Sequence, residues 1–209
     1  MSGKLWPWLF VAGVGCFHGI NPAMGWLFAV ALGLHRRSGR VVLLSLMPIA
    51  LGHAAAIALV IFGVLVLGVV IDPVWLGRAA GTLLLVWAAW HALYGRRHRL
   101  RVGMQTGLWG LALWSFFMAN AHGAGLMLIP ALGPLCLGVT SAGADNEIAM
   151  GAATLAVHTA AMLATIAIVA LLVYAWVGVG FLRTAWINLD LIWVLALGVC
   201  GAVLLFWPV

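Results

Sequence analysis

The same histidine pattern occurs twice in the chain, once in each half. A shift of about 105 positions lays the first pair on the second, and both pairs lie inside long apolar runs. The residues are His18 and His53 in the first half, and His122 and His158 in the second. A polar ring is costly in such a run unless it has a function. Neutral imidazole binds nickel, cobalt, copper and zinc, so the two matched pairs predict one transition-metal site built from both halves.

Four further residues are candidate accessory groups for that site. Pro22 interrupts the first apolar run and frees backbone carbonyls. Asn21, Met24 or these carbonyls could complete the ligand set. Cys16 could bind a metal as its thiolate, although apolar surroundings oppose ionisation. Asp190 is the only acid well inside a run, and it could carry a proton or balance the charge of a cation. The ordinary alternatives are a proline kink, methionine packing, a buried thiol and a structural hydrogen bond or salt bridge.

The composition is that of a helical membrane protein. The 209 residues are 66% hydrophobic and 7% charged, and the mean hydropathy is +1.20. Apolar runs of about 20 residues recur without the alternation of barrel strands. The net charge of +6 comes largely from arginines clustered within 36–40 and 96–101, which indicates membrane topology and not nucleic-acid binding. Three cysteines without a Cys-x-x-Cys motif predict neither a disulfide framework nor a zinc finger.

The apolar runs predict an all-α polytopic membrane protein with six transmembrane helices joined by short loops. The predicted spans are Leu5–Leu34, Val41–Val70, Val74–Tyr94, Thr106–Leu137, Ile148–Val177 and Thr184–Trp207. Arginine-rich loops belong in the cytoplasm, which makes this a multi-pass inner (plasma) membrane protein with both termini outside, in the periplasm. Many of the 12 tryptophans lie near span ends and fit an interfacial belt.

Three spans in each half is an odd number, so the two halves must cross the membrane in opposite directions. Residues 1–102 form the first predicted three-helix repeat and residues 103–209 the second, within one membrane domain. The first helix is expected to break at Asn21-Pro22, and the fourth at the glycines and prolines that follow His122. Inverted repeats with broken helices are typical of secondary transporters, which bind their substrate near the midplane at the repeat interface.

Short segments around the histidines resemble a known family. The segment His18-Gly19-Ile20-Asn21-Pro22-Ala23-Met24-Gly25 resembles the His-x-x-x-Pro-x-His-Gly signature of NicO-type nickel/cobalt exporters, with Met24 in place of its second histidine. The segments around His53 and His158 resemble that family's histidine-bearing second and fifth spans. The layout is similar to the lysine-exporter (LysE) superfamily, nearest to its NicO-type and HupE/UreJ-like membrane proteins. The resemblance implies metal export and leaves the metal open.

Three functions are compatible with these features. The first is a transition-metal cation transporter, an exporter by the resemblance, that carries Ni, Co, Cu or Zn through the histidine site. The second is a membrane metal-, haem- or thiol-dependent electron-transfer or cofactor-maturation protein, because thiol-transferring relatives carry cysteines in the spans that hold Cys16 and Cys136. The third is a small organic solute exporter. We expect no enzyme activity, since no nucleophile–base pair is evident. The expected partners are membrane lipid and the metal ion, with no nucleic acid; a homodimer is left open.

Overall fold

The computed structural model is helical over the residues that it describes, which are 5–68, 71–94, 107–132, 135, 144–177 and 189–206, and these ranges contain no strand. In chain order the elements are α1 (Trp6–Ile20), the 3₁₀ turn η2 (Pro22–Met24), α2 (Trp26–His35), α3 (Gly39–Leu44), α4 (Leu46–Gly68), α5 (Pro73–Tyr94), α6 (Leu108–Ala121), the 3₁₀ turn η4 (Leu126–Leu128), α7 (Ile129–Leu132), α8 (Ala144–Leu172), the π-helical turn η6 (Val173–Val177) and α9 (Leu189–Phe206). The predicted all-α fold class is confirmed for this part of the chain.

Two helices are long and apolar enough to cross a membrane on their own. Gly39–Leu67 has 29 residues and Asn146–Trp176 has 31, against the roughly 20 that a bilayer core requires. The pair Leu108–Ala121 and Leu126–Leu132 passes the same test together, although it is bent by 53°. The shorter apolar helices are Trp6–Ile20, Trp26–His35 and Leu191–Phe206. The structure therefore has two or three helices that are compatible with a membrane location.

Large apolar side chains also cover the outer faces of the helices. Such side chains are unfavourable in water as a contiguous surface, and they are the expected surface where lipid surrounds a helix bundle. Examples that are more than half exposed are Leu9, Leu51, Phe62, Leu93, Trp109, Trp176 and Phe206. They come from six different helical segments, so an apolar exterior is a general property of the described bundle and is not confined to one patch.

The first apolar run is interrupted where the proline predicts it. Pro22 has no backbone N–H and its ring clashes with the carbonyl of His18, so α1 ends just before it. The chain resumes as α2 after Gly25, whose φ of +115° lies in the left-handed region that favours glycine. A Cβ atom at this position would also lie 2.9 Å from the side chain of Ile49. Helix α1 and helix α2 are thus two halves of one interrupted run.

The fourth apolar run is interrupted in a different way. Helix α6 ends at Ala121, and Gly123 follows with a φ of +66°. The backbone closes there through Gly123 N–H to the Asn120 carbonyl at 3.0 Å and Ala124 N–H to the Ala119 carbonyl at 2.9 Å. A left-handed glycine therefore terminates this helix, and the proline of α7 lies further along. Both interruptions fall within the runs predicted to be broken.

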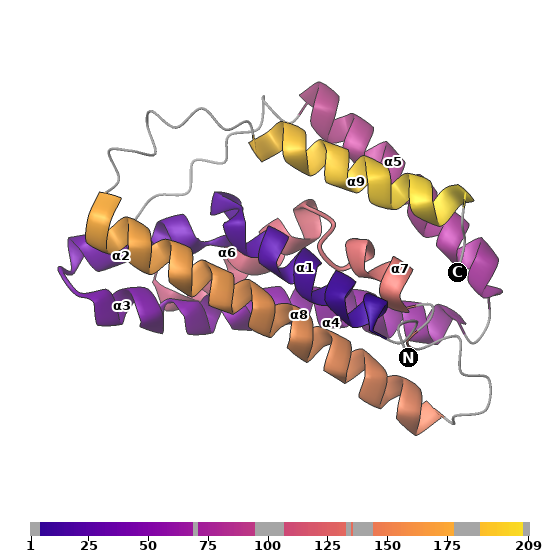
Figure 1. Cartoon of the computed structure of the whole chain (residues 1–209), viewed down its shortest axis with the longest axis horizontal. Helices are drawn as coiled ribbons and strands as arrows, with labels where there is room; N and C mark the ends of the chain where they lie inside the picture. The colour runs from indigo at the N-terminus through magenta and orange to yellow at the C-terminus, as the bar shows by residue number, and fades with distance from the viewer. Residues whose placement is uncertain are drawn as a thin grey trace.

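Three pairs of helices make the most extensive contacts in the bundle: α1 with α8, α4 with α6, and α5 with α9. Figure 1 shows α5 and α9 as a pair lying along one side of the other helices. Glycine permits the close approach in the first two pairs. A Cβ atom on Gly15 of α1 would lie 2.5 Å from the carbonyl oxygen of His158, and one on Gly52 of α4 would collide with the carbonyl oxygen of Ala112.

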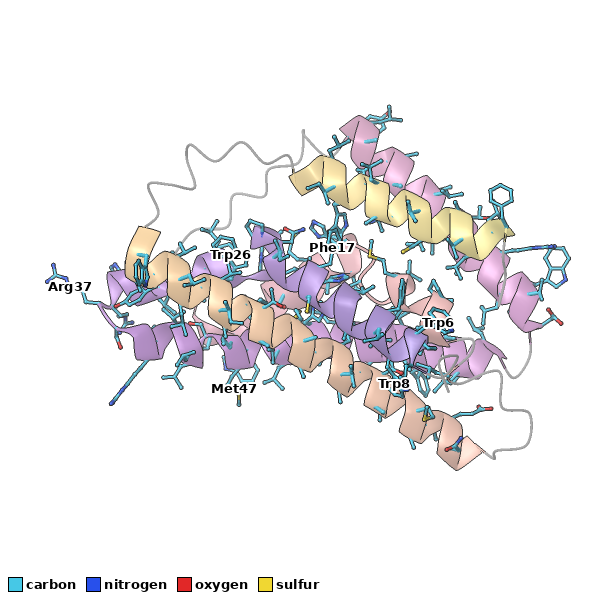
Figure 2. The ribbon with its side chains drawn as sticks, viewed as in Figure 1. Trp6, Trp8, Phe17, Trp26, Arg37 and Met47 are labelled. Atoms are coloured by element: carbon cyan, nitrogen blue, oxygen red, sulfur yellow. The ribbon has the colours of Figure 1, made fainter. Side chains whose placement is uncertain are left out.

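The first apolar run lies along the long axis of the bundle. Figure 2 shows Trp6 and Trp8 near one end of the long axis and Arg37 at the opposite end, with Phe17 and Trp26 between them. The run from α1 to α2 therefore traverses most of the length of the bundle, and its interruption lies part-way along.

We expect Gly15→Ala to destabilise the protein and Gly13→Ala, in the same helix, to leave its stability unchanged or slightly raised. The added methyl group at Gly15 meets the backbone of α8, whereas a Cβ atom at Gly13 meets nothing within 4 Å. Overpacking of this kind costs about 1–3 kcal/mol, while replacing glycine in an exposed helix gains up to about 1 kcal/mol. Thermal unfolding in detergent measures both variants. Equal midpoints for the two would contradict the close α1–α8 contact.

Candidate functional site

Three of the four predicted histidines meet inside the bundle. His18 comes from α1, His53 from α4 and His158 from α8, and all three rings are fully buried. The ring centres lie 5.7 Å apart for His18 and His53, 5.1 Å for His18 and His158, and 5.5 Å for His53 and His158. We call these three residues the histidine triad. It brings together one residue from the second half of the sequence and two from the first.

The helix contacts explain how the triad assembles. Gly15 allows α1 to approach the backbone of His158, and His18 follows Gly15 by about one helical turn on the same face. Gly52 directly precedes His53 and allows α4 to approach α6. The ring of His18 is further fixed because its Nδ1 donates to the carbonyl of Val14 at 2.7 Å. Glycines one turn before His18 and one position before His53 thus allow the close helix contacts that bring the rings together.

Each ring of the triad has one nitrogen without a hydrogen-bond partner in the protein. The nitrogens are Nε2 of His18, Nδ1 of His53 and Nδ1 of His158. His53 and His158 face each other through their Nε2 atoms at 3.2 Å, so one of these atoms donates and the other accepts. A neutral ring that accepts at Nε2 carries its proton on Nδ1, which leaves a buried N–H group unsatisfied. Such a group costs about 1–3 kcal/mol, which is unexpected for rings that only pack.

The pair formed by His53 and His158 is nearly coplanar and meets head to head. The ring planes differ by 6°, and the Nε2 atoms are 3.2 Å apart while the ring centres are 5.5 Å apart, so the nitrogens lie between the centres. A tetrahedral ion about 2.0 Å from each of two imidazole nitrogens holds those nitrogens roughly 3.3 Å apart. The spacing fits an ion, but the two Nε2 atoms point at each other and not at a common point.

The head-to-head pair accounts for a second observation. Among the residues that the structure describes, no group of three or more His, Cys, Asp or Glu side chains is arranged so that it could hold a metal ion as it stands. Coordination by the triad requires the rings of His53 and His158 to rotate until their nitrogens converge, which exchanges their mutual hydrogen bond for bonds to the ion. The chemistry of the donors fits a transition metal, and the unpartnered nitrogens give each ring a ligand atom.

The fourth predicted histidine lies beside the triad and contacts other side chains. His122 follows the last residue of α6, is half-buried, and donates from Nδ1 to the carbonyl of Met118 at 2.9 Å. Its ring contacts those of Trp193 and His91, with centres 5.0 Å and 5.9 Å away. Trp193 also contacts the ring of His18 at 4.9 Å. The predicted four-histidine site thus takes the form of a triad and a neighbour that are linked through one indole ring.

The predicted accessory residues of the first interruption have structural roles. The side chain of Asn21 accepts from the Ala23 N–H at 2.9 Å and caps the turn η2. Met24 is fully buried in an apolar cluster that includes Ile49 and Met162. Both residues are therefore already engaged in holding the broken helix in place.

The remaining predicted accessory residues are placed only in part. Cys16 lies on α1 with its side chain exposed, although it is two positions from a triad histidine. Asp190 belongs to the first turn of α9, and its side chain lies outside what the structure describes. Cys136, the other cysteine of the thiol hypothesis, also lies outside the described residues. The thiol hypothesis stays a prediction.

Tryptophans satisfy the carbonyl groups that the first interruption frees. The indole N–H of Trp26 donates to the Ile20 carbonyl at 3.0 Å, and that of Trp114, from α6, donates to the Ala23 carbonyl at 3.1 Å. Carbonyl groups left without a donor inside an apolar bundle are costly. The two indoles therefore stabilise the broken conformation of the run that carries His18.

The second interruption is satisfied in the same manner. The indole of Trp87, from α5, donates to the Ala121 carbonyl at 2.6 Å, and that of Trp193, from α9, donates to the His122 carbonyl at 3.1 Å. Sequence reasoning assigned the tryptophans to an interfacial belt and missed these roles. A usable signal was present, because Trp87, Trp114 and Trp193 lie in the interior of predicted spans and not at their ends.

Comparisons with known proteins return no match: no protein-family model, no curated protein and no solved structure is significantly similar to this chain. The resemblance of the short histidine segments to LysE-superfamily exporters therefore stays a prediction. The function of the chain has to be inferred from its own residues and their geometry.

We expect Trp114→Phe to lower the stability of the protein by about 1–3 kcal/mol, since the buried Ala23 carbonyl loses its donor while an aromatic ring remains. The matched control is Trp109→Phe on the same helix, because the side chain of Trp109 is 83% exposed. Thermal unfolding in detergent compares the two. If both variants melt at the wild-type temperature, the indole bond does not stabilise the interruption.

Proposed function

We propose that the protein is a membrane transporter for a transition-metal cation and that the histidine triad binds this substrate. The observation that carries the proposal is that three fully buried imidazole rings, from three different helices, each have a nitrogen without a partner in the protein. Imidazole suits nickel, cobalt, copper and zinc. Export as the direction of transport follows from the resemblance to NicO-type exporters.

A purely structural role explains the triad poorly. Buried polar groups in proteins are almost always hydrogen-bonded, and leaving one unsatisfied is destabilising. The triad leaves three such atoms in an apolar environment where a leucine or methionine would pack at no comparable cost. An ion that uses these nitrogens as ligands supplies the missing interactions, which favours a binding role.

The geometry also favours exchange of the ion over permanent binding. The unpartnered Nδ1 atoms of His53 and His158 point away from the Nε2 contact, so both rings must turn and break that hydrogen bond before their Nδ1 atoms can bind one ion together. The internal bond therefore competes with the ion and re-forms when the ion leaves. A resident cofactor is better held by ligands that already converge, while a transported substrate needs a site that also releases it.

The helix contacts support the proposal of six spans in two inverted repeats. Exchanging the halves replaces α1 with α6, α4 with α8 and α5 with α9. Under that exchange the contact of α1 with α8 becomes the contact of α6 with α4, and the contact of α5 with α9 becomes itself. These are the three most extensive helix contacts in the bundle. We therefore propose an inner-membrane protein whose two repeats move against each other around the triad, with both termini in the periplasm.

Metal binding tests the triad directly. The protein, purified in mild detergent, is incubated separately with Ni²⁺, Co²⁺, Cu²⁺ and Zn²⁺, desalted, and analysed by mass spectrometry of its metal content. We expect the wild type to retain an ion that the His53→Ala/His158→Ala double variant lacks, because two of three ligands are gone. His35→Ala is the matched control, since His35 is an exposed histidine at the end of α2.

The other outcomes separate the alternatives. An ion or haem that resists prolonged chelation indicates a fixed cofactor and an electron-transfer or maturation protein. Equal metal content in the wild type and the double variant contradicts the triad as a metal site. Flux of the bound ion into proteoliposomes that is absent with the double variant then establishes transport. Export of an organic solute by the double variant favours the third function, that of a small organic solute exporter.

We expect Arg37→Cys and Asp72→Cys to be labelled from opposite sides of the membrane. Both side chains are exposed and lie beyond the two ends of the continuous apolar segment Gly39–Leu67. In a background with Cys16, Cys136 and Cys200 changed to serine, an impermeant maleimide added outside should label Asp72→Cys only, and Arg37→Cys only after permeabilisation. The reverse pattern contradicts the proposed orientation, and labelling of both from outside contradicts the span.

A further inference from the structure

We infer that His91 and His122 form a second binding site for a transition-metal cation, adjacent to the triad; the class of ion rests on the proposed function. His91 lies in the last turn of α5, and His122 lies at the end of α6. Their ring centres are 5.9 Å apart and their planes are inclined by 47°. The two residues belong to different halves of the sequence, as the triad residues do.

Both rings are held in the way that metal-binding histidines usually are. Nδ1 of His91 donates to the carbonyl of Trp87 at 3.3 Å, and Nδ1 of His122 donates to the carbonyl of Met118 at 2.9 Å. Each acceptor lies one turn earlier on the same helix. A backbone bond at Nδ1 fixes the tautomer and directs coordination to Nε2. His18 of the triad is held by the same kind of bond.

The spacing of the two rings fits one shared ion. Two imidazoles bound to the same ion at about 2.0–2.1 Å have ring centres roughly 4.5–6.5 Å apart, as the angle at the ion opens from a right angle to a straight line. The observed 5.9 Å lies within this range. The described residues supply two imidazole ligands here, and the half-burial of both rings lets water reach the ion, whereas the triad rings are fully buried. The second site is therefore the weaker and the more accessible of the two.

One aromatic side chain connects the two sites. The ring of Trp193 contacts His18 at 4.9 Å and His122 at 5.0 Å, and its N–H donates to the His122 carbonyl. Phe17 stacks on the same indole at 5.0 Å with planes 7° apart, which fixes its orientation. An indole face also attracts cations. An ion that leaves the triad thus has two further imidazoles one aromatic ring away, so the pair serves as a second station on its route.

Zinc titration by calorimetry tests the second site on the full-length protein in detergent. We expect the wild type to bind two Zn²⁺ per chain, and His91→Ala and His122→Ala each to bind one. The triad double variant should also bind one, and this ion should disappear when His91→Ala is added. His35→Ala is again the exposed control. His91→Gln, which keeps a polar side chain but not an imidazole, should behave as His91→Ala does, and its thermal midpoint reports on folding.

The outcomes distinguish the two sites. Wild-type stoichiometry in both His91→Ala and His122→Ala overturns the second site and leaves the triad standing. Loss of an ion in His122→Ala but not in His91→Ala also overturns it, because His122 then acts with the triad as the sequence suggested. An ion that depends on His91 and His122 but not on His53 and His158 supports the second site while contradicting the proposed triad.

Discussion

Two interrupted helices inside an apolar bundle impose the constraint on which the rest of the structure depends. Each interruption frees backbone carbonyls that the surroundings cannot hydrate, so donors must come from elsewhere in the fold. Trp26 and Trp114 supply them at the first interruption, and Trp87 and Trp193 at the second. Three of these four indoles come from helices distant in sequence. The broken conformation of each run is therefore a property of the assembled bundle, and the histidines beside the interruptions are positioned only once those helices have packed.

Local chemistry made part of this arrangement predictable. The absence of an N–H group at Pro22 acts on its own helix, so the first interruption could be placed from the sequence alone. The apolar runs likewise indicated the helices, because their length and composition do not depend on neighbours. The repeat predicted one site of four histidines, and it linked His53 with His158, whose Nε2 atoms lie 3.2 Å apart, across about half the chain.

The remainder depends on contacts between helices, which spacing along one helix does not determine. The partner of His122 depends on where α6 ends relative to α5 and α9, and the structure pairs it with His91. The chemistry of a methionine side chain suits both a metal ligand and a packing residue. Met24 is identified as a packing residue only by the apolar cluster that surrounds it in the structure. The indole bonds were missed because a tryptophan in an apolar run shows its bulk in the sequence and not the direction of its N–H group.

The head-to-head contact of His53 and His158 has a consequence for symmetry. These residues occupy equivalent positions in the two halves of the sequence, and their Nε2 atoms share a single proton. A single proton cannot belong equally to two separate donors at 3.2 Å, so at any instant one half donates and the other accepts. Two matched halves thus become chemically unlike at the point where they touch. Exchanging the two roles requires both rings to change tautomer, so the contact has two equivalent hydrogen-bond assignments that differ in which half donates.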